Sequence, residues 1–250
     1  MSYSIEAWLL TPISGAAVHE IARWTSWHGR LMVLAWGIAL PLGVLTARFF
    51  KVTPLQDWPR ELDNKLWWHA HRGLQWGGVL LMSLGAWLAW GQGRGATTAA
   101  QWHGALGWML LALGWLQVAG GLLRGSKGGP TDAQLRGDHY DMTRWRCVFE
   151  RLHKVLGYGA LLAALAAIVL GLWVADAPRW MWLGLGLWWL VWIGAFAILQ
   201  KQGRCIDTYQ AIWGPGLEHP GNGRVPIGWG VRRVAARQMK KTTTRDKDSK

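Results

Sequence analysis

Five of the eight histidines in the sequence stand at the entrances of long apolar runs. They occur in "SWHGRLM" (His28), "WWHAHRGLQ" (His69 and His71), "QWHGALG" (His103) and "RLHKVLGYG" (His153). An ionisable side chain at the edge of a membrane segment is costly unless it has a partner. Imidazole nitrogens bind transition metals and relay protons, so these segments are the first candidates for chemistry.

The composition indicates a membrane protein. Hydrophobic residues make up 51% of the 250 residues, charged residues only 16%, and there are 22 tryptophans. Tryptophan gathers where one edge of its ring is apolar and the other is wet, as at membrane interfaces. We therefore expect the lipid bilayer to be the main partner of this chain.

The net charge of +13 would indicate a nucleic-acid binder in a soluble protein. Here the basic residues lie mainly between and after the apolar runs, so no nucleic-acid partner is expected. Cys147 and Cys205 form neither a CxxC nor a CxxCH pattern, which excludes c-type haem attachment.

Five apolar runs are long enough to cross a bilayer, which takes about 20 residues. This predicts an all-α, polytopic membrane bundle, with a kink at Pro41. Residues 1–25 are too broken by polar residues to span, although "AAVHEIARW" is expected to form a short interfacial helix. The end of the tail, "KKTTTRDKDSK", is expected to be disordered. The runs are residues 31–50, 73–91, 104–123, 155–175 and 180–199.

Charge sets the orientation of this predicted bundle. The two loops that flank runs two and four at their starts, together with the tail, hold 23 of the 27 basic residues. By the positive-inside rule that side is cytoplasmic. The N-terminus is then outside, or periplasmic if this is the bacterial inner membrane, and the C-terminus is cytoplasmic.

Alternating direction then gives each histidine a depth. Runs one and three go inward, which places His28 and His103 near the outer face. Runs two and four go outward, which places His71 and His153 near the inner face. From His71 to the outer end of its helix is roughly 27 Å at the helical rise, so the two pairs are predicted near opposite faces.

Two histidines from facing helices at one depth can fill both axial positions of a b-type haem. Small residues beside the ligands would let a flat porphyrin approach the backbone, and cations would pair with its propionates. The candidate small residues are Gly29, Gly73, Gly104 and Gly157. The candidate cations are Arg30, Arg72, Arg151 and Lys154.

A single interfacial histidine is more often a polar anchor than a ligand. Four on consecutive helices, paired by depth, favour haem. His69 and His71 are about 200° apart on a helix, so both cannot face one porphyrin. Spacing alone leaves open which of the two is the ligand.

At these residues the sequence resembles the cytochrome b561 family, in the variant whose five-helix core follows a DOMON domain in other proteins. The resemblance covers about residues 26–200, and no DOMON domain is expected in this chain. It rests on "HGRLMVLAWGIALPLGVLTARFF", "WWHAHRGLQ", "HGALGWMLLALGWLQV" and "LHKVLGYGALL", which occur in the family order.

The resemblance implies two b haems held by four helices, with a fifth helix packed outside. It implies bis-histidine ligation by His28 with His103, and by His71 with His153. It selects His71 over His69 because a tryptophan and a glutamine flank His71 at the family spacing. The implied organisation is a segment of residues 1–25, a cytochrome b561-like domain of residues 26–200, and a basic cytoplasmic tail of residues 201–250.

The family moves electrons across membranes, often from ascorbate. The resemblance thus implies an electron-transfer protein or transmembrane oxidoreductase, with Arg48, Lys51 and Arg72 as candidates for an anionic site. For these three cations, a role as positive-inside anchors at the membrane surface is about twice as favoured as an anionic site.

Two alternatives remain. One is a haem-carrying or structural subunit of a larger respiratory or photosynthetic membrane complex, or a homodimer, served by quinol or a periplasmic cytochrome. The other is a haem-free channel that uses its histidines as relays. That reading is disfavoured because the histidines flank the spans and no acidic residue accompanies them inside the runs.

Overall fold

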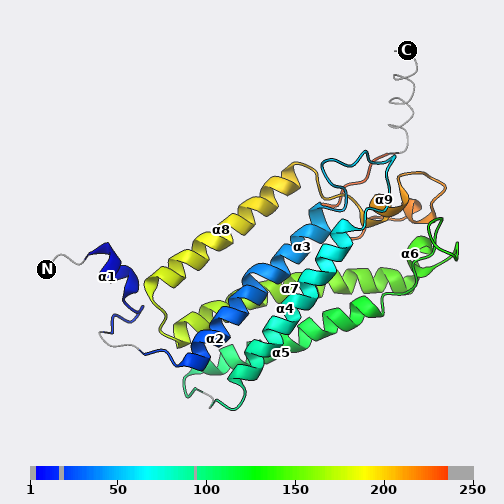
Figure 1. Cartoon of the computed structure of the whole chain (residues 1–250). Helices are drawn as coiled ribbons and strands as arrows, with labels where there is room; N and C mark the ends of the chain where they lie inside the picture. The colour runs from blue at the N-terminus through cyan, green and yellow to red at the C-terminus, as the bar shows by residue number, and fades with distance from the viewer. Residues whose placement is uncertain (1–3, 17–19, 93–94, 236–250) are drawn as a thin grey trace. The chain divides into compact units, whose positions relative to one another are not determined.

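The structure is a computed structural model that describes residues 4–16, 20–92 and 95–235. Within these residues it is all-α, and the only strand-like features are two isolated β-bridges. Five long helical segments follow one another along the chain (Figure 1). They are α2 (Arg23–Met32) continuing through the π-helix η1 (Val33–Ala39) into α3 (Leu40–Phe49), then α4 (Leu66–Ala89), α5 (Thr98–Leu122), α7 (Arg144–Val174) and α8 (Arg179–Lys201).

The long helices end where the apolar runs end, but four of the five begin six to eleven residues earlier than predicted. Backbone hydrogen bonds continue through the polar residues that precede each run, because a helix needs no apolar side chains at its exposed end. The five histidines at the entrances of the apolar runs therefore lie within the helices rather than in loops. His28, His71 and His103 each stand five residues after the first residue of their helix.

Four segments are long and apolar enough to cross a membrane: Arg23–Phe49, Thr98–Leu122, Arg144–Val174 and Arg179–Lys201. Helix α4 has 24 residues, enough for the roughly 30 Å of hydrocarbon, but it is not among them. His69, His71, Arg72 and Gln75 lower its mean hydropathy. Large apolar side chains such as Leu162 (71% exposed) and Leu187 (65% exposed) point outward, as lipid contact requires. The chain is an integral membrane protein built as an all-α bundle.

The chain divides into two compact units, and the boundaries between them fall within or next to the long helices. The first unit contains residues 1–43, 72–118 and 156–197, and the second contains residues 44–71, 119–155 and 198–250. The organisation implied by the resemblance, with boundaries after residues 25 and 200, stays a prediction.

The core of the first unit is formed by buried hydrophobic side chains from several long helices, some small and some large. On α7, Ala160, Ala164 and Ala167 recur at helical spacing and are buried, so this face of α7 permits close packing. The other buried members of this core are Ala35, Trp36, Leu40, Val79, Met82 and Leu110.

Pro41 disturbs the first long segment as its chemistry requires. Proline has no N–H, so it cannot donate to the carbonyl four residues earlier, that of Gly37. The turns before it form the π-helix η1, in which the Leu40 N–H bonds to Ala35 O. Gly37 O accepts the indole N–H groups of Trp188 and Trp192, at 2.9 and 3.1 Å. These two tryptophans of α8 thus donate to a helix of the same unit.

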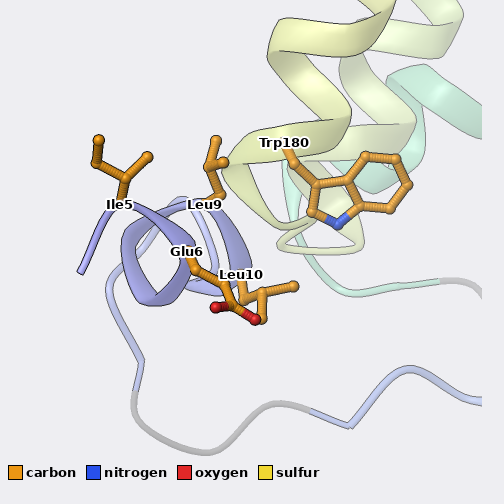
Figure 2. A pocket seen from close by; sticks show the side chains of 5 residues that line it. All are labelled: Ile5, Glu6, Leu9, Leu10 and Trp180. Carbon is orange, nitrogen blue, oxygen red and sulfur yellow. The ribbon is translucent and has the colours of Figure 1, made fainter. Parts of the chain in front are cut away.

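A short helix that the sequence did not predict, α1 (Ile5–Leu10), lies beside the start of α8 (Figure 1). Its residues Ile5, Glu6, Leu9 and Leu10 line a shallow hollow together with Trp180 of α8 (Figure 2). The predicted "AAVHEIARW" helix falls partly on residues 17–19, which lie outside the described residues, and residues 20–22 are not helical.

The second unit has its own aromatic core. Helices α6 (Asp138–Asp141) and α9 (Thr208–Trp213) and the 3₁₀-helix η2 (Pro220–Gly223) pack together there. The Tyr209 hydroxyl donates to Tyr140 O at 2.7 Å, and Arg233 pairs with Asp207. Residues 203–235 of the tail are therefore folded, and the predicted disordered end (residues 240–250) lies outside the described residues. The buried core consists of Trp67, Tyr140, Met142, Tyr209, Ile212, Trp213 and Ile227.

His139 is buried in this second unit, with 6% of its surface exposed, against the rings of Tyr209 and Trp213. Burial, reinforced by the positive charge of Arg146, lowers the pKa of His139 to about 3. Glu150 opposes this shift, while Arg124 and Lys127 add to it. His139 is thus neutral in the folded protein at any ordinary pH.

We expect replacement of Trp188 and Trp192 by phenylalanine to destabilise the bundle. The double variant removes both indole donors from Gly37 O, and a buried acceptor that loses its donors costs about 1–3 kcal/mol. Thermal unfolding in detergent should show a lower Tm than for Trp173→Phe. That control changes a tryptophan that is 61% exposed and makes no indole hydrogen bond within the described structure. Equal Tm values would contradict the role given to the indoles.

His139 should make the second unit acid-sensitive. Its folded pKa lies below its unfolded value, so its contribution to stability is present above about pH 6.5 and is lost as pH falls toward 3. Between pH 7.5 and 5 the loss should be about 2 kcal/mol. His139→Phe should remove this part of the pH dependence, measured by chemical unfolding, whereas exposed His69→Gln should not. An unchanged pH profile in His139→Phe would contradict the assignment.

Candidate functional site

His28 of α2 and His103 of α5 face each other in the first unit. Their ring centres are 5.9 Å apart and the rings are nearly perpendicular, at 79°. Each Nδ1 lies 2.9 Å from a backbone carbonyl, that of Gly85 for His28 and that of Ala167 for His103. A carbonyl can only accept, so the proton sits on Nδ1 in both rings, and each Nε2 keeps its lone pair for a ligand.

His71 of α4 and His153 of α7 face each other in the second unit. Their ring centres are 6.3 Å apart, at an interplanar angle of 80°. Phe149 stacks on His153 with the ring centres 5.3 Å apart, and the ring centres of Trp68 and His71 are 6.2 Å apart. The structure therefore brings together the two pairs that depth predicted, while His69 is exposed.

Both pairs have the dimensions of an axial ligand set. A metal held by one nitrogen of each ring at about 2.0–2.1 Å, the usual metal–imidazole bond, separates the ring centres by roughly 6 Å. Two is also the number of protein ligands that a six-coordinate haem iron takes, since the porphyrin supplies the other four nitrogens. Among the described residues, no group of three or more His, Cys, Asp or Glu side chains is placed to hold a metal ion.

The glycines predicted beside the ligands leave space. A Cβ added at Gly29, Gly73 or Gly104 would meet no heavy atom within 4 Å, and one at Gly157 would meet only Gln117 Nε2, at 3.8 Å. A flat macrocycle can approach the backbone at such positions.

The predicted cations are placed differently from one another. Arg30, Arg72 and Arg151 are exposed. Lys154 is half-buried and its ammonium donates to Glu150 Oε1 and to the carbonyl of Ile227, both at 2.6 Å. In this structure Lys154 thus ties α7 to the tail.

Arg48 and Lys51 are buried, and each donates a hydrogen bond to a backbone carbonyl of the tail. Arg48 donates to Trp229 O at 2.8 Å and to the side chain of Gln200 at 2.9 Å. Lys51 donates to Ile206 O at 2.9 Å and to Arg48 O at 3.1 Å. Burial, followed by the nearby charge of Lys154, lowers the pKa of Lys51 to about 8. The tail thus covers these two cations. The sequence did not predict this contact.

Sequence reasoning also missed the residues that hold the first pair. Gly85, Ala167 and Gly171 contact His28 or His103 from neighbouring helices. In the sequence they are three of many small residues in apolar runs, so nothing in their pattern distinguishes them.

Comparison with known proteins gives three relatives of low identity. The chain is 27% identical over 164 residues to a "Cytochrome b561, DM13 and DOMON domain-containing protein" of Arabidopsis thaliana, covering 66% of this chain and 16% of that protein. It is 24% identical over 200 residues to a "Cytochrome b561 and DOMON domain-containing protein" of the same plant, covering 74% and 42%. It is 30% identical over 151 residues to human "Ferric-chelate reductase 1", covering 60% and 22%.

The chain thus spans less than half the length of each of these relatives. No protein-family profile matches the chain, and no solved structure matches it either.

Proposed function

We propose that this chain, a relative of the cytochrome b561 proteins, is a di-haem b-type cytochrome that passes electrons between the two faces of a membrane. The observation that carries the proposal is the presence of two facing histidine pairs at the predicted positions. A haem iron with two axial imidazoles changes between ferric and ferrous and so supplies a one-electron relay.

The first pair is built to hold such a group. The carbonyls of Gly85 and Ala167 fix the Nδ1–H tautomers of His28 and His103 and make each Nε2 a stronger base. A more basic Nε2 would favour the ferric state of a bound haem. These two hydrogen bonds would therefore help to set the redox potential of that haem.

The second pair belongs to the unit that carries most of the basic residues. By the positive-inside rule we assign this pair to the cytoplasmic face, the N-terminus to the periplasm and the C-terminus to the cytoplasm of a bacterial inner membrane. The covering of Arg48 and Lys51 by the tail favours a redox protein or quinol as the partner over a small anion bound directly to these two cations.

Loss of a ligand should remove one haem and spare the other. We expect His71→Ala and His153→Ala to lose the haem of the second pair, and His28→Ala and His103→Ala that of the first. The pyridine haemochrome of each purified variant should fall from two haems per chain to one. His69→Ala, a matched control two residues from His71, should keep both. Two variants of different pairs that lose the same haem would contradict the assignment.

Vesicles can separate the proposed function from a subunit role in a larger complex. With ferricyanide inside and dithionite outside, vesicles that contain the protein alone should reduce the trapped ferricyanide, and His28→Ala or His153→Ala should abolish this. Haem-loaded protein that is reduced by dithionite but transfers nothing across the bilayer would favour the subunit role.

A further inference from the structure

Gly171 of α7 lies directly against the imidazole of His103. A Cβ built at Gly171 would be 2.9 Å from Cε1 and 3.3 Å from Nδ1 of that ring. Real Cβ atoms essentially never make contacts below 3.0 Å, so any other residue here would push the ring away from α7. The glycine therefore sets how closely α7 and the imidazole approach.

Ala167 stands one turn before Gly171 and acts on the same ring. Its carbonyl accepts the proton of His103 Nδ1 at 2.9 Å, and the residue is only 7% exposed. The carbonyl fixes the rotation of the imidazole about the Cβ–Cγ bond of His103. The space at Gly171 sets the distance between the ring and α7. Together they fix the direction in which Nε2 points. A metal ligand binds well only when its donor atom points toward the metal.

Helix α4 repeats part of this arrangement for His28. The Gly85 carbonyl accepts from His28 Nδ1, and a Cβ at Gly85 would be 3.0 Å from Met32 Cε. Gly85 follows His71 by 14 residues, and Ala167 follows His153 by the same 14. Each helix that carries a ligand of the second pair thus presents, at the same register, a carbonyl that orients a ligand of the first.

We infer that Gly171 is a positioning residue for the haem of the His28–His103 pair. This rests on the proposed function. Helix α7 then has two tasks: it supplies His153 to one haem, and through Ala167 and Gly171 it orients the axial ligand of the other. Any residue larger than glycine at position 171 would tilt Nε2 away from the axial direction.

The test compares Gly171→Ala with Gly159→Ala. Both add one methyl group to α7, but a Cβ at Gly159 meets nothing within 4 Å, and this residue shares an exposed face with Val155 and Leu162. We expect Gly171→Ala to release the first-pair haem to apomyoglobin about 10–100-fold faster, the usual effect of disturbing a residue that orients a metal ligand. It should also shift the midpoint potential of the first-pair haem and its low-spin electron paramagnetic resonance signal. These are the redox transition and the signal that His103→Ala removes. The other haem serves as an internal control for folding.

Selective weakening of that haem in Gly171→Ala, greater in Gly171→Val and absent in Gly159→Ala, would support the inference. Equal retention in Gly171→Ala and Gly159→Ala, or equal weakening of both haems, would overturn it while leaving the proposed function intact. Unmodified protein without b-type haem would overturn the proposed function as well.

Discussion

An imidazole has two nitrogens, and in the first pair each is given a separate task. The Nδ1 atoms of His28 and His103 donate to carbonyls at 2.9 Å, so each ring is held by a neighbouring helix. Each Nε2 then keeps its lone pair for a ligand. In an apolar bundle a buried nitrogen without a hydrogen-bond partner is costly, so the haem that we propose between the two rings would satisfy both lone pairs. The proposed electron transfer depends on that division.

The same rule of satisfying polar groups inside an apolar environment explains features away from the histidines. Pro41 cannot donate to Gly37 O, and two indole N–H groups from α8 are placed on it. Gln75, an amide within an apolar run, donates to Leu40 O at 3.1 Å. Part of the tryptophan content is therefore structural: these side chains bring a donor to the backbone at the end of a large apolar ring.

The sequence predicts the number of long helices, their C-terminal ends and the two histidine pairs, because apolar length and depth are local properties. Spacing could not decide between His69 and His71, and the resemblance did. Spacing also could not predict which donors satisfy Gly37 O before Pro41, since they are indoles some 150 residues later in the chain. Nor could it predict the role of Gly171, because a glycine in an apolar run shows no sign of the ring that packs on it. The covering of Arg48 and Lys51 by the tail escaped prediction for a similar reason: their partners in the tail are the backbone carbonyls of Trp229 and Ile206, and every residue has a backbone carbonyl.

The most direct measurement is a density map of the protein purified in lipid nanodiscs. The account predicts two planar porphyrins per chain, one bonded to the Nε2 atoms of His28 and His103 and the other held by His71 and His153. Rings of one pair in contact with no porphyrin between them, or a porphyrin ligated by histidines of different pairs, would contradict it.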